Sequence, residues 1–467
     1  MKRVAFYTLG CKLNQAETES LLHQFREAGF ELVAPDDVAD VYIANTCTVT
    51  HIADRKSRHW LRLARRRNPE ALIIAAGCYA RRAPQELGEL ADIVFDNEGK
   101  EHLPGIVKGL LWPTCDFVIS SRKQCHREPE LRAERGGSEA SWELQAKQFH
   151  LTNGSTRVRS LVKIQDGCHS PCTYCIVPHV RSREYSVPAS QIVEEIRQKV
   201  AKGYKEVILT GTKIGSYEDG NTDLRGLVEK ILSDTDIKRL RLSSLQPQEI
   251  SPEFLALWQD YILNPSPERS EGTYEGSGRI CCHFHLALQS GSDTVLKRMK
   301  RGYSLDNYRT AMNLIKETIP EAAITTDIIV GFPGESDEEF EQSHRFCHEA
   351  GFANIHVFPL SPRPGTRAAK MPDQVKDKVK KERSEKMLEL AQNCRHSFCE
   401  RFLGQIRYVL WEKETAFGDG VYSGLTDNYI RVFTQSEKPL ANRITAVKLL
   451  WFHDQGMWGV LINENSG

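Results

Sequence analysis

The chain has 467 residues and carries 62 basic and 62 acidic side chains, so its formal net charge is zero. This balance excludes a uniformly basic nucleic-acid-binding protein, although a local basic patch is compatible with it. Apolar residues make up 40% and charged residues 27%, as in globular proteins, and the length suggests about three domains. Because no apolar stretch is long enough to span a membrane and no signal-peptide pattern is present, we expect a cytoplasmic protein.

Residues 1–112 alternate between segments typical of strands and of helices. Strands are predicted at 4–9, 40–44, 72–76 and 92–96, and helices at 14–28 and in segments that end near 67 and 111. This alternation predicts a parallel sheet with helices on its faces. Ligands of such sheets bind beyond the carboxyl ends of the strands.

Three of the 13 cysteines, Cys11, Cys47 and Cys78, closely follow the first three predicted strands. The carboxyl ends of parallel strands lie along one edge, so we expect these thiols to converge. Three thiolates suit a four-iron cluster with one iron left without a protein ligand. Zinc with three cysteines and water, or three buried structural thiols, are the alternatives. Asn14 and Glu17 flank this edge, either to orient a ligand or to cap a helix.

The helix predicted after Cys47 is strongly basic. It carries seven cations and no acid between residues 55 and 67, namely Arg55, Lys56, Arg58, Arg62, Arg65, Arg66 and Arg67. Helical spacing places Arg55, Arg58, Arg62 and either Arg65 or Arg66 on one stripe. Such a stripe is often only a solvated face, but the lack of counter-charges favours contact with phosphates.

The strongest signal follows a segment, residues 113–156, that is rich in Pro, Gly, Ser and charge and is predicted to be a linker. Beyond it, DGCHSPCTYC places Cys168, Cys172 and Cys175 in a CxxxCxxC array after a predicted strand. This spacing indicates metal or cluster ligation. A zinc site would need a fourth ligand, for which His169 and His179 are available.

Six strands with intervening helices are predicted in this middle part, and they suggest a partial (β/α)6 barrel. The strands are 159–165, 206–210, 240–245, 283–288, 323–330 and 355–360, and the helices include 189–201, 224–232, 306–316 and 336–349. Functional residues are expected where such strands end. Four of these ends carry glycines, hydroxyls or amides, in the segments TGTKIG, SS, QSGS and GFPGE.

These motifs resemble known enzymes. The middle part resembles radical S-adenosylmethionine (SAM) enzymes, and Tyr174 before the third cysteine fits their cluster loop. The whole chain resembles the methylthiotransferase family, most closely its MtaB branch, through GCKLNQAETE, ADVYIANTCTVT, GCHSPCTYCIVP, HFHLALQSGSDTVLKRMKRGY and TDIIVGFPGE. It departs from the family at Ser182, Glu218 and Ala287, and residues 264–278 resemble an insertion, but no departure removes a cluster ligand.

The resemblance implies two [4Fe–4S] clusters and SAM. Cys168, Cys172 and Cys175 would hold the radical cluster, and Cys11, Cys47 and Cys78 an auxiliary cluster that donates sulfur. Together with the strand-end pattern it implies SAM contacts at Tyr174, Thr210, Gly211, Ser244, Gln289 and Gly331. The basic stripe would bind RNA through Arg55, Arg58, Arg62, Arg65 and Arg66, and no catalytic side chain is expected beyond the cluster ligands.

The C-terminal part is predicted to be a small β domain behind a long helix at 374–401. Its strands are predicted at 406–411, 421–422, 429–433, 444–450 and 458–462, and it resembles the RNA-binding TRAM domain. Tyr408, Trp411, Tyr422 and Tyr429 would either stack on bases or form the core. The predicted domains are therefore 1–112, a linker at 113–156, a barrel at 157–385, a connecting helix at 386–401 and a β domain at 402–463.

The resemblance implies methylthiolation of tRNA. NTCTVTHIADRKSR and LTGTKIGSY are most similar to the branch that acts at C2 of N6-threonylcarbamoyladenosine, at position 37 of tRNAs reading codons that begin with A. A flavodoxin or ferredoxin would donate electrons. Related enzymes act on isopentenyladenosine in tRNA or on a ribosomal-protein aspartate. A non-catalytic zinc or iron–sulfur RNA-binding protein is a different class, and the complete strand-end pattern argues against it.

Overall fold

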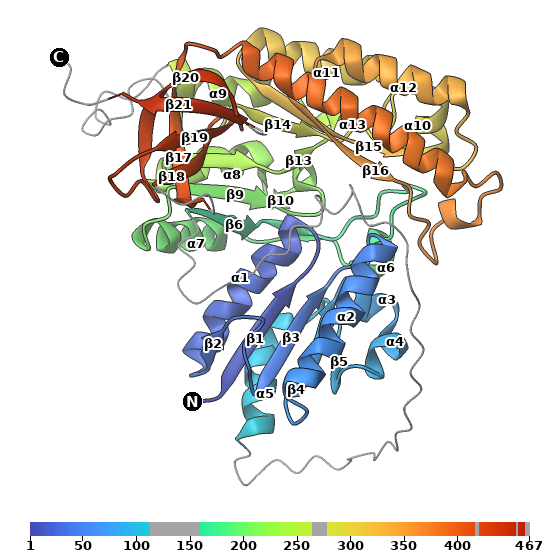
Figure 1. Cartoon of the computed structure of the whole chain (residues 1–467), viewed down its shortest axis with the longest axis vertical. Coiled ribbons are helices and arrows are strands. Elements are labelled where there is room, and N and C mark those ends of the chain that lie inside the picture. The colour runs from blue at the N-terminus through green and yellow to red at the C-terminus, as the bar shows by residue number, and fades with distance from the viewer. Residues whose placement is uncertain (113–157, 264–277, 416–419, 454–455, 463–467) are drawn as a thin grey trace. The chain divides into compact units, whose positions relative to one another are not determined.

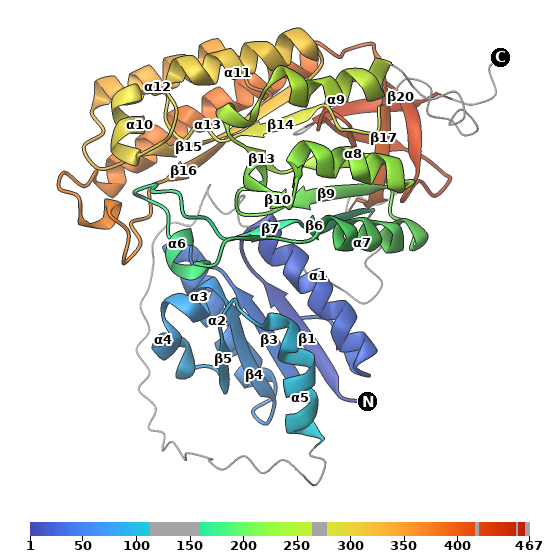
Figure 2. The ribbon, with the colours of Figure 1, turned by 180° about the vertical axis from the view of Figure 1, so that it is seen from behind.

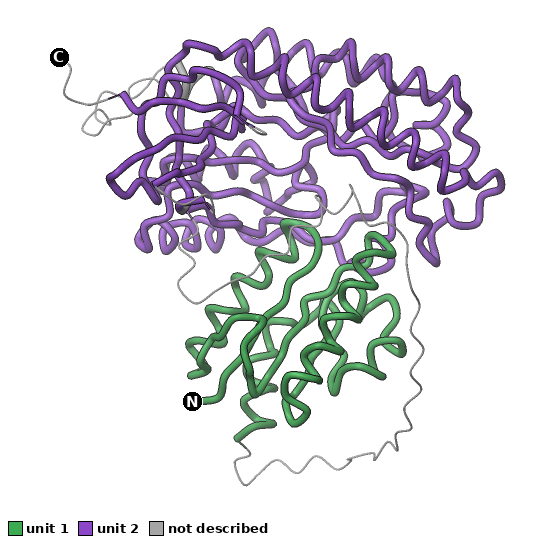
Figure 3. Tube along the Cα trace, in the orientation of Figure 1, with its two compact units in different colours: residues 1–154 green, residues 155–467 purple. Residues whose placement is uncertain are grey.

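The computed structural model describes residues 1–112, 158–263, 278–415, 420–453 and 456–462. The chain forms two compact units, residues 1–154 and 155–467 (Figure 3). The predicted linker at 113–156, and all but the last residue of the segment at 264–278, lie outside the described residues. Among the helices of the described part, none is both long and apolar enough to cross a membrane.

Unit 1 contains a parallel sheet with strand order β2-β1-β3-β4-β5 (Figure 1). Its strands are β1 (Arg3–Thr8), β2 (Glu31–Val33), β3 (Val41–Thr46), β4 (Leu72–Gly77) and β5 (Ile93–Phe95). The predicted parallel sheet is confirmed, with one strand more than expected. Strand β2 has three residues, too few for a recognisable pattern, and it forms the edge beside β1.

Helices cover both faces of this sheet (Figures 1 and 2). One face packs on α1 (Lys12–Glu27) and α5 (Leu103–Leu111), and the other on α2 (His51–Arg67), α3 (Cys78–Arg82) and α4 (Pro84–Gly88), while η1 (Lys100–His102) precedes α5. Strand alternation explains the two cores, because Phe6 meets Phe25 on one side and Tyr7 stacks on Trp60 at 4.7 Å on the other.

Unit 2 contains parallel strands in the order β6-β9-β12 and β13-β14-β15-β16. They are β6 (Arg159–Lys163), β9 (Glu206–Thr210), β12 (Arg239–Leu242), β13 (Ser244–Leu245), β14 (His283–Leu286), β15 (Ala323–Val330) and β16 (Asn354–Pro359). Because only Ser243 separates β12 from β13, the two occupy one strand position. The six positions follow chain order, and the predicted partial (β/α)6 barrel is confirmed.

Helices surround these strands on the outside (Figure 2). They are α7 (Ala189–Ala201), α8 (Leu224–Asp234), α9 (Pro252–Leu263), α10 (Asp293–Met299), α11 (Leu305–Thr318), α12 (Asp337–Ala350) and α13 (Asp377–Glu400). Short elements fill the loops: β7 (Gln165–Asp166), α6 (Val177–Val180), β8 (Tyr185–Ser186), η3 (Ile214–Ser216), β10 (Glu218–Asp219), β11 (Thr222–Asp223), η4 (Pro247–Glu249) and η6 (Ala368–Lys370).

The last strands close into a β-barrel in the order β17-β18-β19-β21-β20, as predicted. They are β17 (Ile406–Glu414), β18 (Val421–Thr426), β19 (Arg431–Gln435), β20 (Ile444–His453) and β21 (Gly456–Leu461). Tyr429 was expected to begin a strand but lies in the turn before β19 at φ +68°. Its ring stacks on His283 at 4.4 Å, which holds it against β14.

The closed barrel docks on the amino ends of the parallel strands through buried arginines. Arg239 donates to the carbonyls of Leu425 and Tyr408, at 2.9 and 2.6 Å. Arg241 donates to the Asp427 carbonyl at 2.9 Å. These hydrogen bonds join β12 to β17 and to the end of β18. They leave the opposite, carboxyl ends of the parallel strands uncovered by this barrel.

The centre of this interface is the Arg241–Glu206 ion pair. Arg241 Nε donates to Glu206 Oε1 at 2.8 Å, and both side chains have no solvent exposure. Burial alone would raise the pKa of Glu206, but the Arg241 guanidinium brings this pKa below its ordinary value. A buried pair of this kind adds little by itself, yet breaking it leaves an uncompensated buried charge.

Replacing Glu206 with Gln should therefore lower the free energy of unfolding by about 3–5 kcal/mol, measured by urea denaturation of the full chain. The matched control is Glu229→Gln, which removes the exposed pair of Arg225 and Glu229 (side chains 42% and 46% exposed). Its effect should stay within about 0.5 kcal/mol. Equal losses in the two variants would contradict this role for the buried pair.

Candidate metal centres

Cys11, Cys47 and Cys78 lie where β1, β3 and β4 end. Cys11 precedes the first residue of α1, Cys47 follows β3 directly, and Cys78 is the first residue of α3. The Leu9 N–H donates to the Asn45 carbonyl at 3.0 Å and so joins the first two of these loops. Burial raises the pKa of Cys47, and the nearby Cys78 and Cys11 thiols raise it further. The three sulfurs thus share one neighbourhood.

Two glycines let these loops approach each other. Gly10 has φ +108°, and a Cβ there would lie 2.7 Å from Cys47 Cβ. Gly77 has φ +103°, and its Cβ would lie 2.5 Å from the Thr46 carbonyl oxygen. A side chain at either position would be strained and would push a cysteine loop away.

The two metal centres considered for the thiols of unit 1 differ in the spacing of the sulfurs that they require. Three sulfurs on one zinc, each at about 2.3 Å, would lie about 4 Å apart, whereas a four-iron cluster binds each thiolate through a different iron. No three His, Cys, Asp or Glu side chains of the described residues are arranged to hold a single ion. The raised pKa of Cys47 also means that cation binding must offset the burial of thiolate charge.

A polar network supports the loops of Cys11 and Cys47. Asn14 donates to the carbonyls of Leu9 and Thr46 at 2.8 and 3.1 Å. Glu17 pairs with buried Lys100 at 2.7 Å, and Lys100 also donates to Asn45 Oδ1 at 3.0 Å. Asn14 and Glu17 therefore stabilise the loops of Cys11 and Cys47 through these contacts. The sequence did not indicate Lys100 as the partner of Glu17.

A second network joins the loops of Cys47 and Cys78. Arg82, from α3, donates from Nε to Thr48 Oγ1 at 2.7 Å and pairs with Asp54 at 3.0 Å. Asp54 also accepts a hydrogen bond from Thr48 Oγ1 at 2.7 Å. Because Thr48 and Asp54 are buried, this clamp fixes the position of Cys47 relative to the α3 helix that carries Cys78.

In unit 2, the CxxxCxxC loop runs between β7 and α6 and is closed at its base. Gly167 has φ +77°, and a Cβ there would lie 2.1 Å from the Arg183 carbonyl oxygen. Arg181, beyond α6, donates to both carboxylate oxygens of Asp166 at 2.8 Å. Cys168, Cys172 and Cys175 are all half-buried on the loop between these anchors.

The middle of the loop is fixed to the body of unit 2. The Thr173 N–H donates to the Met299 carbonyl at 3.0 Å, and the Ala368 N–H donates to the Thr173 carbonyl at 2.8 Å. Tyr174 packs against an apolar cluster that includes Met299. Burial raises the pKa of Cys175 to about 12, so a metal bound to this sulfur would have to displace its proton. His169, a possible zinc ligand, is held by the Ser182 carbonyl at 2.8 Å instead.

Five of the predicted SAM contacts lie outside the CxxxCxxC loop, at the carboxyl ends of the parallel strands of unit 2. Thr210 ends β9, Ser244 is exposed on β13, and Gln289, after β14, has φ +72°. Gly211 and Gly331 permit close packing, since added Cβ atoms would lie 2.8 Å from the Gln165 carbonyl oxygen and 2.4 Å from Lys380 Cγ. Protein contacts alone thus explain both glycines, and SAM contact by any of the five stays a prediction.

The inner face of the strands carries a polar pair that the sequence did not single out. His285 Nε2 lies 3.2 Å from Asp327 Oδ2, with side-chain exposures of 12% and 27%. His285 Nδ1 also lies 3.0 Å from Thr325 Oγ1, so both ring nitrogens of His285 face polar atoms of the chain. The pair is a polar feature of β14 and β15 inside the partial barrel.

The basic stripe on α2 divides into two groups. Arg58 pairs with Glu86 at 3.5 Å, and Arg65 pairs with Asp92 at 2.6 Å, so these two side chains hold α2 to the rest of unit 1. Arg55, Arg62 and Arg66 are exposed and make no ion pair with the described residues. The free part of the stripe is therefore narrower than the sequence predicted.

The aromatic residues considered for base stacking are mostly covered. Trp411 is fully buried in the core of the closed barrel, and Arg241 lies over the Tyr429 ring at 5.0 Å. In the described part of the closed barrel, Trp451 is an exposed indole, 51% accessible, and it stacks with Trp458 at 6.2 Å. The sequence pattern did not distinguish these outward residues from those of the core.

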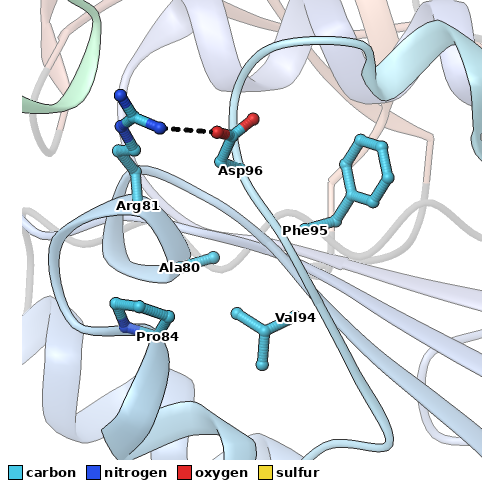
Figure 4. A pocket seen from close by; sticks show the side chains of 6 residues that line it. All are labelled: Ala80, Arg81, Pro84, Val94, Phe95 and Asp96. Carbon is cyan, nitrogen blue, oxygen red and sulfur yellow. Dashed lines mark hydrogen bonds and ion pairs between the residues drawn. The ribbon is translucent and has the colours of Figure 1, made fainter.

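A pocket in unit 1 lies among α3, α4 and β5 (Figure 4). It is lined by Ala80, Arg81, Pro84, Val94, Phe95 and Asp96. Arg81 and Asp96 form an ion pair of 2.8 Å at its edge. None of the predicted cluster ligands lines this pocket, so the cysteine edge remains the candidate site of unit 1.

Comparison with known proteins identifies the family. Residues 162–347 match the Radical SAM superfamily, and residues 3–96 match the Uncharacterized protein family UPF0004. The chain is 35% identical to Threonylcarbamoyladenosine tRNA methylthiotransferase MtaB of Bacillus subtilis, over 96% of this chain and 94% of that protein. The chain belongs to the radical SAM methylthiotransferase family. This confirms the family and the enzyme class expected from the motifs, and it implies SAM and one [4Fe–4S] cluster.

Two further similarities bear on branch and fold. The chain is 32% identical to tRNA-2-methylthio-N(6)-dimethylallyladenosine synthase of Thermodesulfovibrio yellowstonii, over 99% of this chain and 100% of that protein. The solved structure of the radical SAM methyltransferase TsrM from Kitasatospora setae aligns with a TM-score of 0.53 at 14% identity, over 79% of this chain and 74% of that chain. The latter supports the fold alone.

Gly10→Ala should lower the iron content after anaerobic reconstitution by about four per chain, because the added methyl displaces Cys47 and with it one cluster. Gly105→Ala is the control, since Gly105 lies on α5 and a Cβ there meets no atom within 4 Å. Full iron loading of Gly10→Ala would show that the spacing of these two loops does not govern cluster binding.

Proposed function

We propose that this enzyme inserts a methylthio group at C2 of N6-threonylcarbamoyladenosine, at position 37 of tRNAs reading codons that begin with A. The observation that supports this most is the similarity, over 96% of the chain, to a relative named as a threonylcarbamoyladenosine tRNA methylthiotransferase. The segments NTCTVTHIADRKSR and LTGTKIGSY support the same branch. We place the reaction in the cytoplasm, with a flavodoxin or ferredoxin as electron donor.

Two cysteine sets would hold two [4Fe–4S] clusters in this proposal. Cys168, Cys172 and Cys175 would bind the radical cluster, and Cys11, Cys47 and Cys78 the auxiliary one, each with an iron left for a non-protein ligand. When bound, the clusters and SAM supply the radical that removes the adenine hydrogen and the sulfur and methyl that replace it, which no side-chain base could do.

The contribution of the chain itself is to hold and shield these groups. The Asp166–Arg181 pair fixes the base of the radical loop, and the packing of Tyr174 keeps water from one side of it. Thr210 and Gln289 lie at strand ends where polar groups can bind SAM. Fixed geometry of this kind converts binding energy into alignment of the reacting atoms.

RNA binding is assigned to two surfaces. Arg55, Arg62 and Arg66 form an exposed stripe on α2 without ion-pair partners among the described residues, and they would contact phosphates. The closed barrel presents Trp451, a side chain suited to stacking on an unpaired base. The target adenosine would have to leave its loop stack, which single-stranded loops permit.

A paired assay tests the substrate. The reconstituted enzyme is incubated with tRNA bearing threonylcarbamoyladenosine and with tRNA bearing isopentenyladenosine, the alternative supported by the 32% identity to the dimethylallyladenosine enzyme. Nucleoside mass spectrometry should find the methylthio gain on the first substrate only. A gain only on the second, or only on a ribosomal-protein aspartate, would contradict the proposed substrate.

Changing Arg55, Arg62 and Arg66 together to Glu should weaken tRNA binding and reduce the slope of log affinity against log salt by about 2–3, since each phosphate contact contributes about 0.7–0.9. The cleavage of SAM without tRNA should not change. Lys378, Lys381 and Lys386 are exposed on α13 (88%, 66% and 62%), and their change to Glu is the charge-matched control. Equal weakening by the two triple variants would mean that only overall charge matters.

A further inference from the structure

Arg301 is a half-buried cation in contact with the predicted radical-cluster loop. Its Nη1 donates to Cys172 Sγ at 3.3 Å and lies 3.4 Å from the Tyr174 hydroxyl oxygen. No carboxylate of the described residues lies within 4.0 Å of its guanidinium. The Cys172 sulfur, which would be a thiolate on a cluster, is therefore a contact of Arg301 that would compensate its charge.

The guanidinium is held in this position from the opposite side. Arg301 Nε donates to the Tyr303 hydroxyl at 2.9 Å, and the guanidinium also lies over the Tyr303 ring at 4.8 Å. The Tyr303 hydroxyl donates in turn to the Leu288 carbonyl at 3.0 Å, just beyond β14. Arg301 thus connects one cysteine of the loop to a strand end of the partial barrel, with little freedom to move.

A fixed positive charge beside a ligand sulfur changes the chemistry of an iron–sulfur cluster. Hydrogen bonds to ligand sulfurs and nearby charge are among the factors that set its reduction potential. Reduction adds one electron from a low-potential one-electron donor and no proton, so the reduced form is more negative and gains more from the cation. Because Arg301 is half-buried, solvent screens its charge less than it would at the open surface.

We propose that Arg301 is a positioning residue that fixes Cys172 and raises the reduction potential of the cluster held by Cys168, Cys172 and Cys175. This inference rests on the proposed radical cluster. Arginine suits the role because its planar fork donates to the sulfur and to Tyr303 at once, whereas a lysine ammonium presents a compact charge on a flexible stem.

The test titrates the cluster against potential by electron paramagnetic resonance, without SAM. Cys11, Cys47 and Cys78 are all replaced by Ala in the full chain, so that one cluster is observed. The comparison is made at the midpoint potential of the protein with native Arg301. At this potential, Arg301→Gln should lower the ratio of reduced to oxidised cluster about tenfold, which corresponds to a midpoint potential lower by about 59 mV for one electron. Arg301→Lys should lie between the two.

Arg298→Gln is the matched control, because Arg298 pairs with Glu339 at 2.6 Å and its side chain does not contact the cysteines. It should titrate like the protein with native Arg298. If Arg301→Gln titrates like the protein with native Arg301, the proposal is overturned. Weaker SAM binding by the same variant would then mean that Arg301 binds SAM and does not set the potential. If Arg301→Gln binds no iron, the Arg301→Lys variant is titrated in its place. A midpoint potential of Arg301→Lys equal to that of the protein with native Arg301 would also overturn the proposal. A background protein that binds no iron would overturn the radical cluster itself.

Discussion

Parallel strand pairing is the constraint on which the candidate chemistry of unit 1 depends. Cys11, Cys47 and Cys78 are separated by more than thirty residues along the chain, and no local motif could bring them together. The registers of β1, β3 and β4 place the ends of these strands side by side. Gly10 and Gly77 then remove the side chains that would keep the loops apart. In unit 1, strand pairing brings the three cysteines together, whereas in unit 2 their close spacing in the sequence does so.

The cysteine loop of unit 2 is built by the opposite strategy. Cys168, Cys172 and Cys175 lie within eight consecutive residues, so the backbone conformation of one loop determines their arrangement. Arg181 closes its base from nearby in the chain, but the anchors behind Thr173, Met299 and Ala368, come from distant positions. A local ligand set can therefore be recognised in the sequence, whereas the contacts that fix its shape cannot.

The same distinction explains which parts of the fold were predictable. β9 and β15 were predicted at their observed ends, because apolar runs bounded by turn residues define buried parallel strands. β2 was missed, since three residues carry no period. The closed C-terminal barrel followed from its strand pattern. Its docking did not, because Arg239 and Arg241, which donate to carbonyls of the closed barrel, look like surface charges in the sequence.

Long-range ion pairs account for most of what the sequence could not show at the sites. Arg65 belonged to a stripe predicted to meet RNA, but its partner Asp92 is 27 residues away and holds it within unit 1. Lys100 meets Glu17 across 83 residues, and Arg301 meets Cys172 across 129. The sequence alone gives no sign of such contacts, because Arg65, Lys100 and Arg301 are by themselves ordinary surface residue types.

In the proposed reaction, the sheet edge of unit 1 supports sulfur insertion and the loop of unit 2 supports radical formation. The most direct test replaces Cys11, Cys47 and Cys78 with Ala and measures 5′-deoxyadenosine and the methylthio nucleoside in the same reaction. We expect that 5′-deoxyadenosine still forms while the methylthio product is absent. Methylthio product at the level of the unmodified enzyme would contradict it and reduce the three cysteines to a structural role.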